Sequence, residues 1–130
     1  MRYTRFRKGP AAKIELDEVL VIATRFTFKH LRHMPLIIAH GMRLRNQWGN
    51  TPGAVGVSVA ADILGRTTYS ISVWDSEDSF RQWFLSDYHA SLVKAYRKWV
   101  ESSDSVRWHT GHFVPGEGWR QAMQRLTAPA

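Results

Sequence analysis

Histidines and clustered aromatic residues are the parts of this 130-residue sequence that could do chemistry. The stretch 70–89, SISVWDSEDSFRQWFLSDYH, is typical of a strand that turns into a helix, and a break in that helix precedes His89. Beyond the break, His89, Val93 and Tyr96 recur at helical spacing, so we expect His89 to face the sheet. Such a histidine is either a satisfied core residue or a functional base, acid or axial ligand.

His40 is the second histidine of interest, because it lies beside the apolar positions Ile37, Leu44 and Trp48 of an earlier candidate helix. It could approach the same sheet face as His89. Two histidines at one pocket would suit proton transfer, with their pKa values tuned by burial. The alternative is one histidine at the solvent edge and one in the core.

The other histidines do not predict a metal site. His109 and His112 have an odd spacing on a candidate strand, which places them on opposite faces. His30 and His33 lie in a connector with no third ligand in view. We also find no glycine-rich phosphate loop and no nucleophile elbow.

Composition limits the classes of function. The chain has no cysteine, which excludes disulfides and thiolate sites and fits a cytoplasmic location. No segment approaches the ~18 apolar residues of a membrane span. The net charge is +7, but no basic run is interleaved with aromatic residues, so we expect no specific nucleic-acid binding.

The pattern of elements predicts the fold. Residues 1–17 form an expected flexible basic leader, and residues 18–130 form a single domain. Periodicity and turn signals indicate strands at 19–28, 54–63, 66–74 and 105–114, and helices at 36–48, from Asp75 or Ser76 to about Val100, and at 117–126. This β-α-β-β-α-β order predicts a ferredoxin-like α+β fold. We expect a four-stranded antiparallel sheet with helices on one face and a second copy of the chain on the other.

The hairpin strands indicate where a ligand could lie. Strict alternation places small residues and one tryptophan on a single predicted face: Ala54, Gly56, Ser58, Ala60, Ser70, Ser72 and Trp74. Small residues either leave room for a ligand or let a bulky helix pack closely. Trp83, Phe84 and Phe80 could fill the room themselves.

This corner of the chain resembles a known superfamily, the dimeric α+β barrel proteins. The resemblance rests on a few short motifs: Tyr69-Ser-Ile-Ser-Val-Trp74, the following Asp-Ser-x-x-x-Phe-x-x-Trp, Ser-Asp-Tyr-His89, Met34-Pro35, Pro52-Gly53, Thr110-Gly111 and Gly118-Trp119. The superfamily includes antibiotic-biosynthesis monooxygenases, haem-degrading monooxygenases and polyketide cyclases. The sequence looks nearest to the spheroidene monooxygenase-like group. The resemblance implies a homodimer and a role in secondary metabolism.

The resemblance also implies roles for single residues. Trp83 matches a tryptophan beside the haem plane of haem-degrading members, whereas their proximal histidine falls on Val93, so that ligand is missing. His89 matches the histidine of the spheroidene-type pattern. This departure argues against haem degradation and leaves either no cofactor or haem held by His89.

Together, the residues and the resemblance imply a small monooxygenase-like enzyme. It would bind a hydrophobic, conjugated or aromatic substrate between sheet and helices. The expected catalytic residues are His89, His40, Tyr96 and Arg25, and the expected substrate-binding residues are Trp74, Trp83, Phe80, Ser70, Ser72, Ser58 and Val93. The alternatives are a cofactor-free cyclase or isomerase of a polyketide-like substrate, or a non-enzymatic protein that binds haem or another lipophile.

Overall fold

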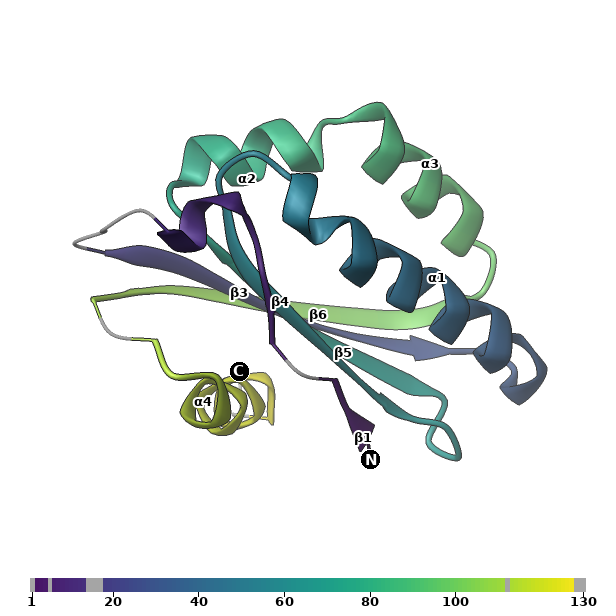
Figure 1. The fold of residues 1–130 in the computed structure, drawn as a ribbon. Helices are drawn as coiled ribbons and strands as arrows, with labels where there is room; N and C mark the ends of the chain where they lie inside the picture. The colour runs from purple at the N-terminus through teal and green to yellow at the C-terminus, as the bar shows by residue number, and fades with distance from the viewer. Residues whose placement is uncertain (1, 5, 14–17, 112, 128–130) are drawn as a thin grey trace.

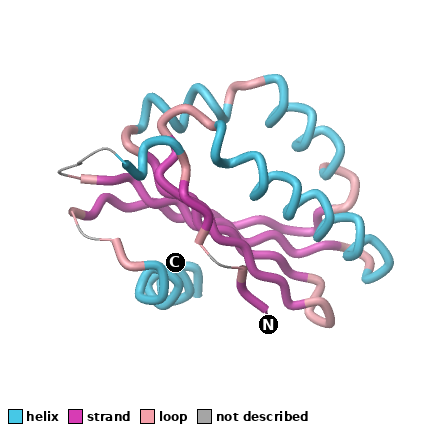
Figure 2. Tube along the Cα trace, viewed as in Figure 1, coloured by secondary structure: helices cyan, strands magenta, loops and turns pink. Residues whose placement is uncertain are grey.

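An antiparallel sheet with helices on both faces makes up the chain (Figures 1 and 2). The computed structural model describes residues 2–4, 6–13, 18–111 and 113–127. Its strands are β1 (Arg2–Tyr3), β2 (Arg7–Lys8), β3 (Val19–Phe28), β4 (Ala54–Asp62), β5 (Thr67–Trp74) and β6 (Val100–Thr110). Its α-helices are α1 (Met34–Gln47), α2 (Glu77–Phe84), α3 (Asp87–Tyr96) and α4 (Pro115–Thr127), with 3-10 turns at Pro10–Lys13, Leu31–His33 and Trp48–Asn50.

The strand order β1-β4-β5-β3-β6, with β2 also paired to β4, confirms the ferredoxin-like α+β prediction and extends it. The prediction of four strands is wrong, because the N-terminal segment adds β1 and β2 to the free edge of β4. Phe6 lies over Gly56, where a side chain on the strand would meet the phenyl ring. The described part of the expected leader is therefore packed on the domain, and residues 1, 5 and 14–17 lie outside the described residues.

The second helical region is divided into α2 and α3 at Ser86, whose side chain forms hydrogen bonds with the end of α2 and with the start of α3. Its Oγ donates to the carbonyl of Trp83 at the end of α2 and accepts from the backbone N–H of His89 in α3. Ser76 begins α2 in the same way, since its side chain accepts from the N–H of Ser79. The predicted break is confirmed, although α3 ends at Tyr96 and β6 begins earlier than expected, at Val100.

Helix α4 contradicts the expectation that all helices cover one face. Helices α1, α2 and α3 lie on one side of the sheet and α4 lies on the other (Figure 1). Gly118, Ala122 and Leu126 recur every four residues and are buried. Ala122 and Leu126 pack in one core with strand residues such as Val21 and others of β5 and β6. An apolar stripe on a terminal helix thus covers part of the face that a second copy was expected to cover.

A register shift in β4 overturns the predicted row of small residues. The β4–β5 pairing shifts between Ala54 and Gly56, so Ser58 lies opposite Ile71 and Val57 lies opposite Ser72. Beyond the shift, the small residues of β4 face α4 and its valines face the other helices. Strict alternation fails here because a bulge moves every following side chain to the opposite face.

Among the described residues, no helix is both long enough and apolar enough to cross a membrane.

Candidate functional site

A row of small polar side chains crosses the sheet beneath α1, α2 and α3. We call it the polar strip: Thr24, Ser70, Ser72 and Ser105. Thr24 is the cross-strand partner of both Ser70 and Ser105, and its Oγ1 lies 3.4 Å from Ser105 Oγ. Thr24, Ser70 and Ser72 are only half-buried and Ser105 is exposed, although helices pass over this face. Helices α2 and α3 contain no fully buried side chain.

An aromatic cluster fills the space at one end of the polar strip. Trp74 lies 5.1 Å from Trp48, 5.6 Å from Trp83 and 5.7 Å from Phe80, measured between ring centroids. Trp74 is fully buried and its Nε1 donates to Ser72 Oγ at 3.0 Å, so it is a core residue that no ligand reaches in this structure. The side chains of Trp83 and Phe80 are only half-buried, so part of each remains accessible to solvent.

His89 belongs to the edge of this cluster. Its ring lies 4.6 Å from the ring of Trp83 and 4.6 Å from that of Phe84. Burial lowers the pKa of His89 below its usual 6.5, and a backbone hydrogen bond with Phe84 offsets part of that effect. A half-buried imidazole with a lowered pKa is neutral near pH 7, which is the form that accepts a proton.

His40 and Tyr96 form a pair at the other end of the strip. His40 Nδ1 lies 3.2 Å from the Tyr96 hydroxyl, and the two rings stack with 6° between their planes. Burial raises the pKa of Tyr96 to about 12, with a further contribution from Tyr88, so the phenol stays protonated. Tyr96 also packs edge-on against Phe28, which is fully buried.

The structure therefore places His89 and Tyr96 on one inward side of α3, seven residues or about 10 Å apart along the helix. His40 contacts Tyr96 from α1, and the polar strip belongs to the sheet face that these helices cover. The half-buried positions of α3 are His89, Leu92, Ala95 and Tyr96, whereas Val93 is 44% exposed. Val93 therefore does not face the sheet with His89 and Tyr96, and its expected role in substrate binding is not supported by its exposure.

Two other expected site residues lie on the opposite face of the sheet. Arg25 pairs with Asp104 there, with Nη2 2.9 Å from Oδ2. Ser58 is buried on that face, where it accepts from Trp119 Nε1 at 3.0 Å and donates to the carbonyl of Thr4. The sheet separates both residues from His40 and His89.

The remaining histidines do not gather around a metal. His109 is exposed on β6, with Nε2 3.9 Å from Glu77, and His112 lies outside the described residues. Within the described ranges, no three His, Asp or Glu side chains are placed to hold an ion.

His89 packs against aromatic rings and does not line either of the two best-formed cavities of the described structure. The two best-formed cavities among the described residues have volumes of about 350 and 290 Å³, and no described histidine lines either. The larger lies between the N-terminal segment and the start of α4, and the smaller lies between α2 and β6. His89 instead contacts the aromatic rings of Trp83 and Phe84 in α2.

Sequence analysis missed three contributors to this site. Thr24 and Ser105 lie in strands whose other residues dominate the pattern, and only the pairing of β3 with β6 brings them beside Ser70. Trp48 was assigned to a helix stripe, yet its ring centroid lies 5.7 Å from that of Trp83 and its buried Nε1 has no hydrogen-bond partner among the described residues.

No family model and no curated protein matches the sequence. Solved structures do match its fold. SnoaB, a cofactor-independent oxygenase from Streptomyces nogalater, is 17% identical with a TM-score of 0.55, over 76% of this chain and 98% of that one. LmHde, a haem-degrading enzyme from Listeria monocytogenes, is 18% identical with a TM-score of 0.63, over 83% and 69%.

A third structure shares the same architecture. An uncharacterised ferredoxin-fold protein from Listeria monocytogenes, related to antibiotic biosynthesis monooxygenases, is 18% identical with a TM-score of 0.56, over 72% of this chain and 57% of that one. Identities this low establish the fold alone. This chain therefore has the ferredoxin-like α+β fold that these three structures share.

Proposed function

We propose that this chain is a small oxygenase-like enzyme that binds a hydrophobic, conjugated or aromatic substrate over the polar strip. One observation carries the proposal: the sheet face that α1, α2 and α3 cover has a half-exposed polar floor, and the same helices carry His89, with its lowered pKa, and the His40–Tyr96 pair. The half-buried rings of Trp83 and Phe80 supply apolar contact area beside it. Two structural neighbours, a cofactor-independent oxygenase and a haem-degrading enzyme, add support.

The proposed first step is a proton transfer. Neutral His89 accepts a proton from an activated CH₂ group of the substrate, and the carbanion left behind reduces molecular oxygen. One oxygen atom enters the substrate and the other leaves as water, so R₂CH₂ + O₂ gives R₂C=O + H₂O. The electrons come from the substrate, and the reaction needs no further reductant.

His40 and Tyr96 would stabilise the charge that develops. Because Tyr96 stays protonated, its hydroxyl can donate to a substrate enolate or phenolate oxygen. In the tautomer with the proton on Nδ1, His40 donates to the Tyr96 hydroxyl oxygen and leaves the phenol proton free to be donated to the substrate. We assign no role to Arg25, because the sheet lies between it and this site.

The homodimer, the cytoplasmic location and the role in secondary metabolism were also predicted from the sequence. The homodimer stays a prediction, and α4 leaves a second copy only part of the sheet face on which to pack. Light scattering coupled to size-exclusion chromatography measures that state. The cytoplasmic location and the place in secondary metabolism also stay predictions.

Oxygen uptake with an anthrone-like substrate tests the proposed function. We expect the colourless protein to consume one O₂ per substrate, and we expect His89→Gln to lower kcat by about 100-fold or more, as loss of a general base does. His109→Gln is the matched control, since His109 is exposed and its Nε2 lies 3.9 Å from the Glu77 carboxylate.

Other outcomes would support the alternatives. Turnover under argon would identify a cyclase or isomerase instead. A Soret band after addition of haem, lost in His89→Gln, would identify a haem protein and overturn the cofactor-free reaction.

A further inference from the structure

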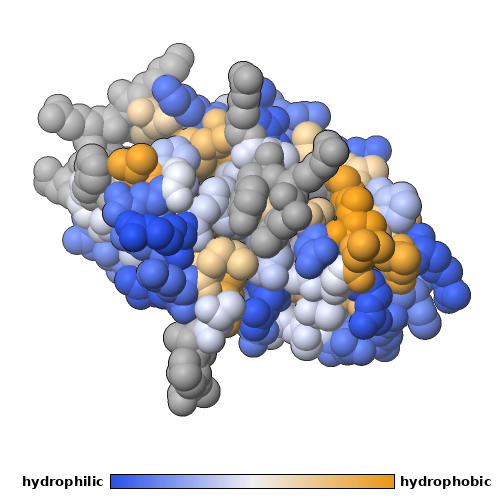
Figure 3. All heavy atoms as spheres, turned by 90° about the horizontal axis from the view of Figure 1, so that it is seen from below, coloured by the Kyte–Doolittle hydropathy of each residue, from blue (hydrophilic) through white to orange (hydrophobic). Residues whose placement is uncertain are grey.

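The tip of the β4–β5 hairpin exposes two adjacent aliphatic side chains. Leu64 is 86% exposed and Ile63 is 51% exposed. Among the large hydrophobic residues described, only Leu85 is comparably exposed, at 69%. Leu31 is also about half exposed, at the same end of the molecule in the turn that follows β3. In the view from below, apolar surface gathers at this end with hydrophilic surface around it (Figure 3).

Hydrogen bonds within the turn hold these side chains outward. The N–H of Arg66 donates to the carbonyl of Ile63 at 3.0 Å, and the N–H of Gly65 donates to Asp62 Oδ1 at 3.2 Å. Thr67 Oγ1 donates to the carbonyl of Gly65 at 2.8 Å. The apolar tip is therefore a fixed feature of the fold.

Arg66 anchors the tip to the neighbouring strand. It has a φ of 53°, a conformation that costs a non-glycine residue energy and favours glycine. An arginine at this position gives a bond that glycine cannot give: Arg66 Nη1 donates to the carbonyl of Lys29 at 2.8 Å. The N–H of Phe28 also donates to the carbonyl of Arg66 at 2.8 Å.

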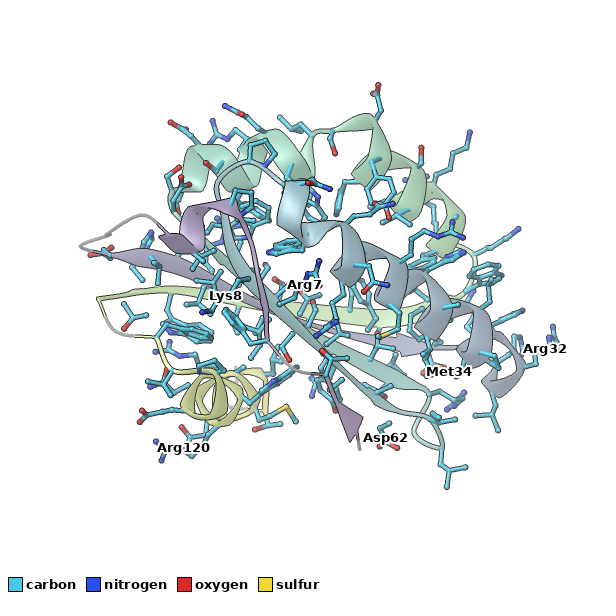
Figure 4. The ribbon with its side chains drawn as sticks, viewed as in Figure 1. Arg7, Lys8, Arg32, Met34, Asp62 and Arg120 are labelled. Carbon is cyan, nitrogen blue, oxygen red and sulfur yellow. The ribbon has the colours of Figure 1, made fainter. Side chains whose placement is uncertain are left out.

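The side chains around the tip are cationic. Lys29, Arg32 and Arg66 lie at this end, and Figure 4 shows Arg32 pointing outward from it. Asp62 is the acid of the turn, and its carboxylate accepts from the backbone. The local balance has the same sign as the net charge of the chain, +7.

We propose that this end of the molecule docks on an anionic lipid surface. Ile63 and Leu64 enter the boundary between headgroups and acyl chains, while the cations remain at the level of the phosphates. A convex tip suits a deformable lipid surface, because a protein partner would need a matching groove. The docking stands apart from the chemistry, although it would also bring a lipophilic substrate close to the enzyme if the proposed function holds.

Vesicle flotation with the full-length chain tests the proposal. We expect binding to vesicles of phosphatidylcholine with phosphatidylglycerol, weaker binding to phosphatidylcholine alone, and loss of the difference in high salt. The double variant Ile63→Ser, Leu64→Ser should lower the bound fraction on anionic vesicles by about tenfold or more. Leu85→Ser is the matched control, because Leu85 is 69% exposed on the α2–α3 connection, away from the tip.

Three results would overturn the proposal: no binding to the anionic vesicles, equal loss in the tip variant and in Leu85→Ser, or a change in molecular mass in the tip variant that marks a contact between copies. Circular dichroism of each variant confirms that the chain is folded. Since the assay reads binding and not turnover, its failure is distinct from failure of the proposed function.

Discussion

The hydroxyl of Tyr96 lies 3.2 Å from His40 Nδ1, and the two rings stack almost in parallel at a centroid distance of 5.8 Å. The contact joins α1 to α3, two helices that pass over the same sheet (Figure 1). It also fixes a protonated phenol beside the polar strip. This pair thus has both a structural and a proposed chemical consequence, and the two can be measured separately.

Tyr96→Phe keeps the stacked rings and removes the hydrogen bond. We expect the free energy of unfolding to fall by about 1 kcal/mol, the usual contribution of one such bond. We also expect the loss of the tyrosine that titrates near pH 12, read as tyrosinate absorbance. Tyr69→Phe is the control, because it should leave that late titration in place.

The raised pKa of Tyr96 predicts the alkaline limb of stability. The folded chain holds the Tyr96 proton more tightly than the unfolded chain, in which the pKa of tyrosine is 10. The contribution is therefore complete below pH 10 and is lost as the pH rises to about 12. Urea unfolding across this window should show a smaller decline for Tyr96→Phe than for the unmodified chain.

The lowered pKa of His89 predicts the opposite limb. The unfolded chain binds the proton more tightly, so the contribution is present above pH 6.5 and is lost as the pH falls through the folded pKa. His89→Gln should flatten the dependence of the unfolding midpoint on pH below 6.5. His33 also has a pKa lowered by burial, so His33→Gln serves as the parallel variant. An unchanged acid slope in His89→Gln would contradict the burial of that imidazole.

Trp74 and Trp83 should separate stability from binding. Trp74→Leu leaves a cavity in the core and removes the bond to Ser72, so we expect a loss of about 3 kcal/mol in urea unfolding. Trp83 is half-buried, and Trp83→Leu should cost about 1 kcal/mol while lowering kcat/KM for an aromatic substrate. Equal stability losses would show that Trp83 is as much a core residue as Trp74.

Two glycine substitutions should have effects of opposite sign. The added methyl group of Gly56→Ala would meet the ring of Phe6, so we expect a loss of about 1–3 kcal/mol and faster proteolysis of the N-terminal segment. Gly41→Ala lies in the interior of α1 with nothing within 4 Å of the new carbon, and should raise stability by about 0.5–1 kcal/mol. Thermal unfolding and limited proteolysis measure both.

The position of most elements could be predicted from local pattern. The β-branched and aromatic run 19–28 became β3 over the same residues, and Ser76 and Ser86 began the helices that their side chains cap. These features depend on neighbours within a few residues, through alternation, helical period and capping bonds. The order of strands and helices then restricts the fold to a few arrangements.

The composition of the site could be predicted only in part. Helical period predicted that His89 and Tyr96 share one side of a helix, and both are half-buried positions of α3. Arg25 does not join them, because its strand position places it on the α4 side beside Asp104. A residue on a strand buried on both faces has no local signal that says which layer lies above it.

The sequence by itself determined where β3, α2 and α3 begin and which residues are apolar along them, since those properties come from nearby side chains. The tertiary structure decided the rest. A bulge beside Val55 places Ser58 on the α4 face of the sheet. Packing of Ala122 and Leu126 on the sheet places α4 on the face opposite to the other helices. Both choices depend on contacts between residues far apart in the chain, whose free energy exists only once the layers are assembled.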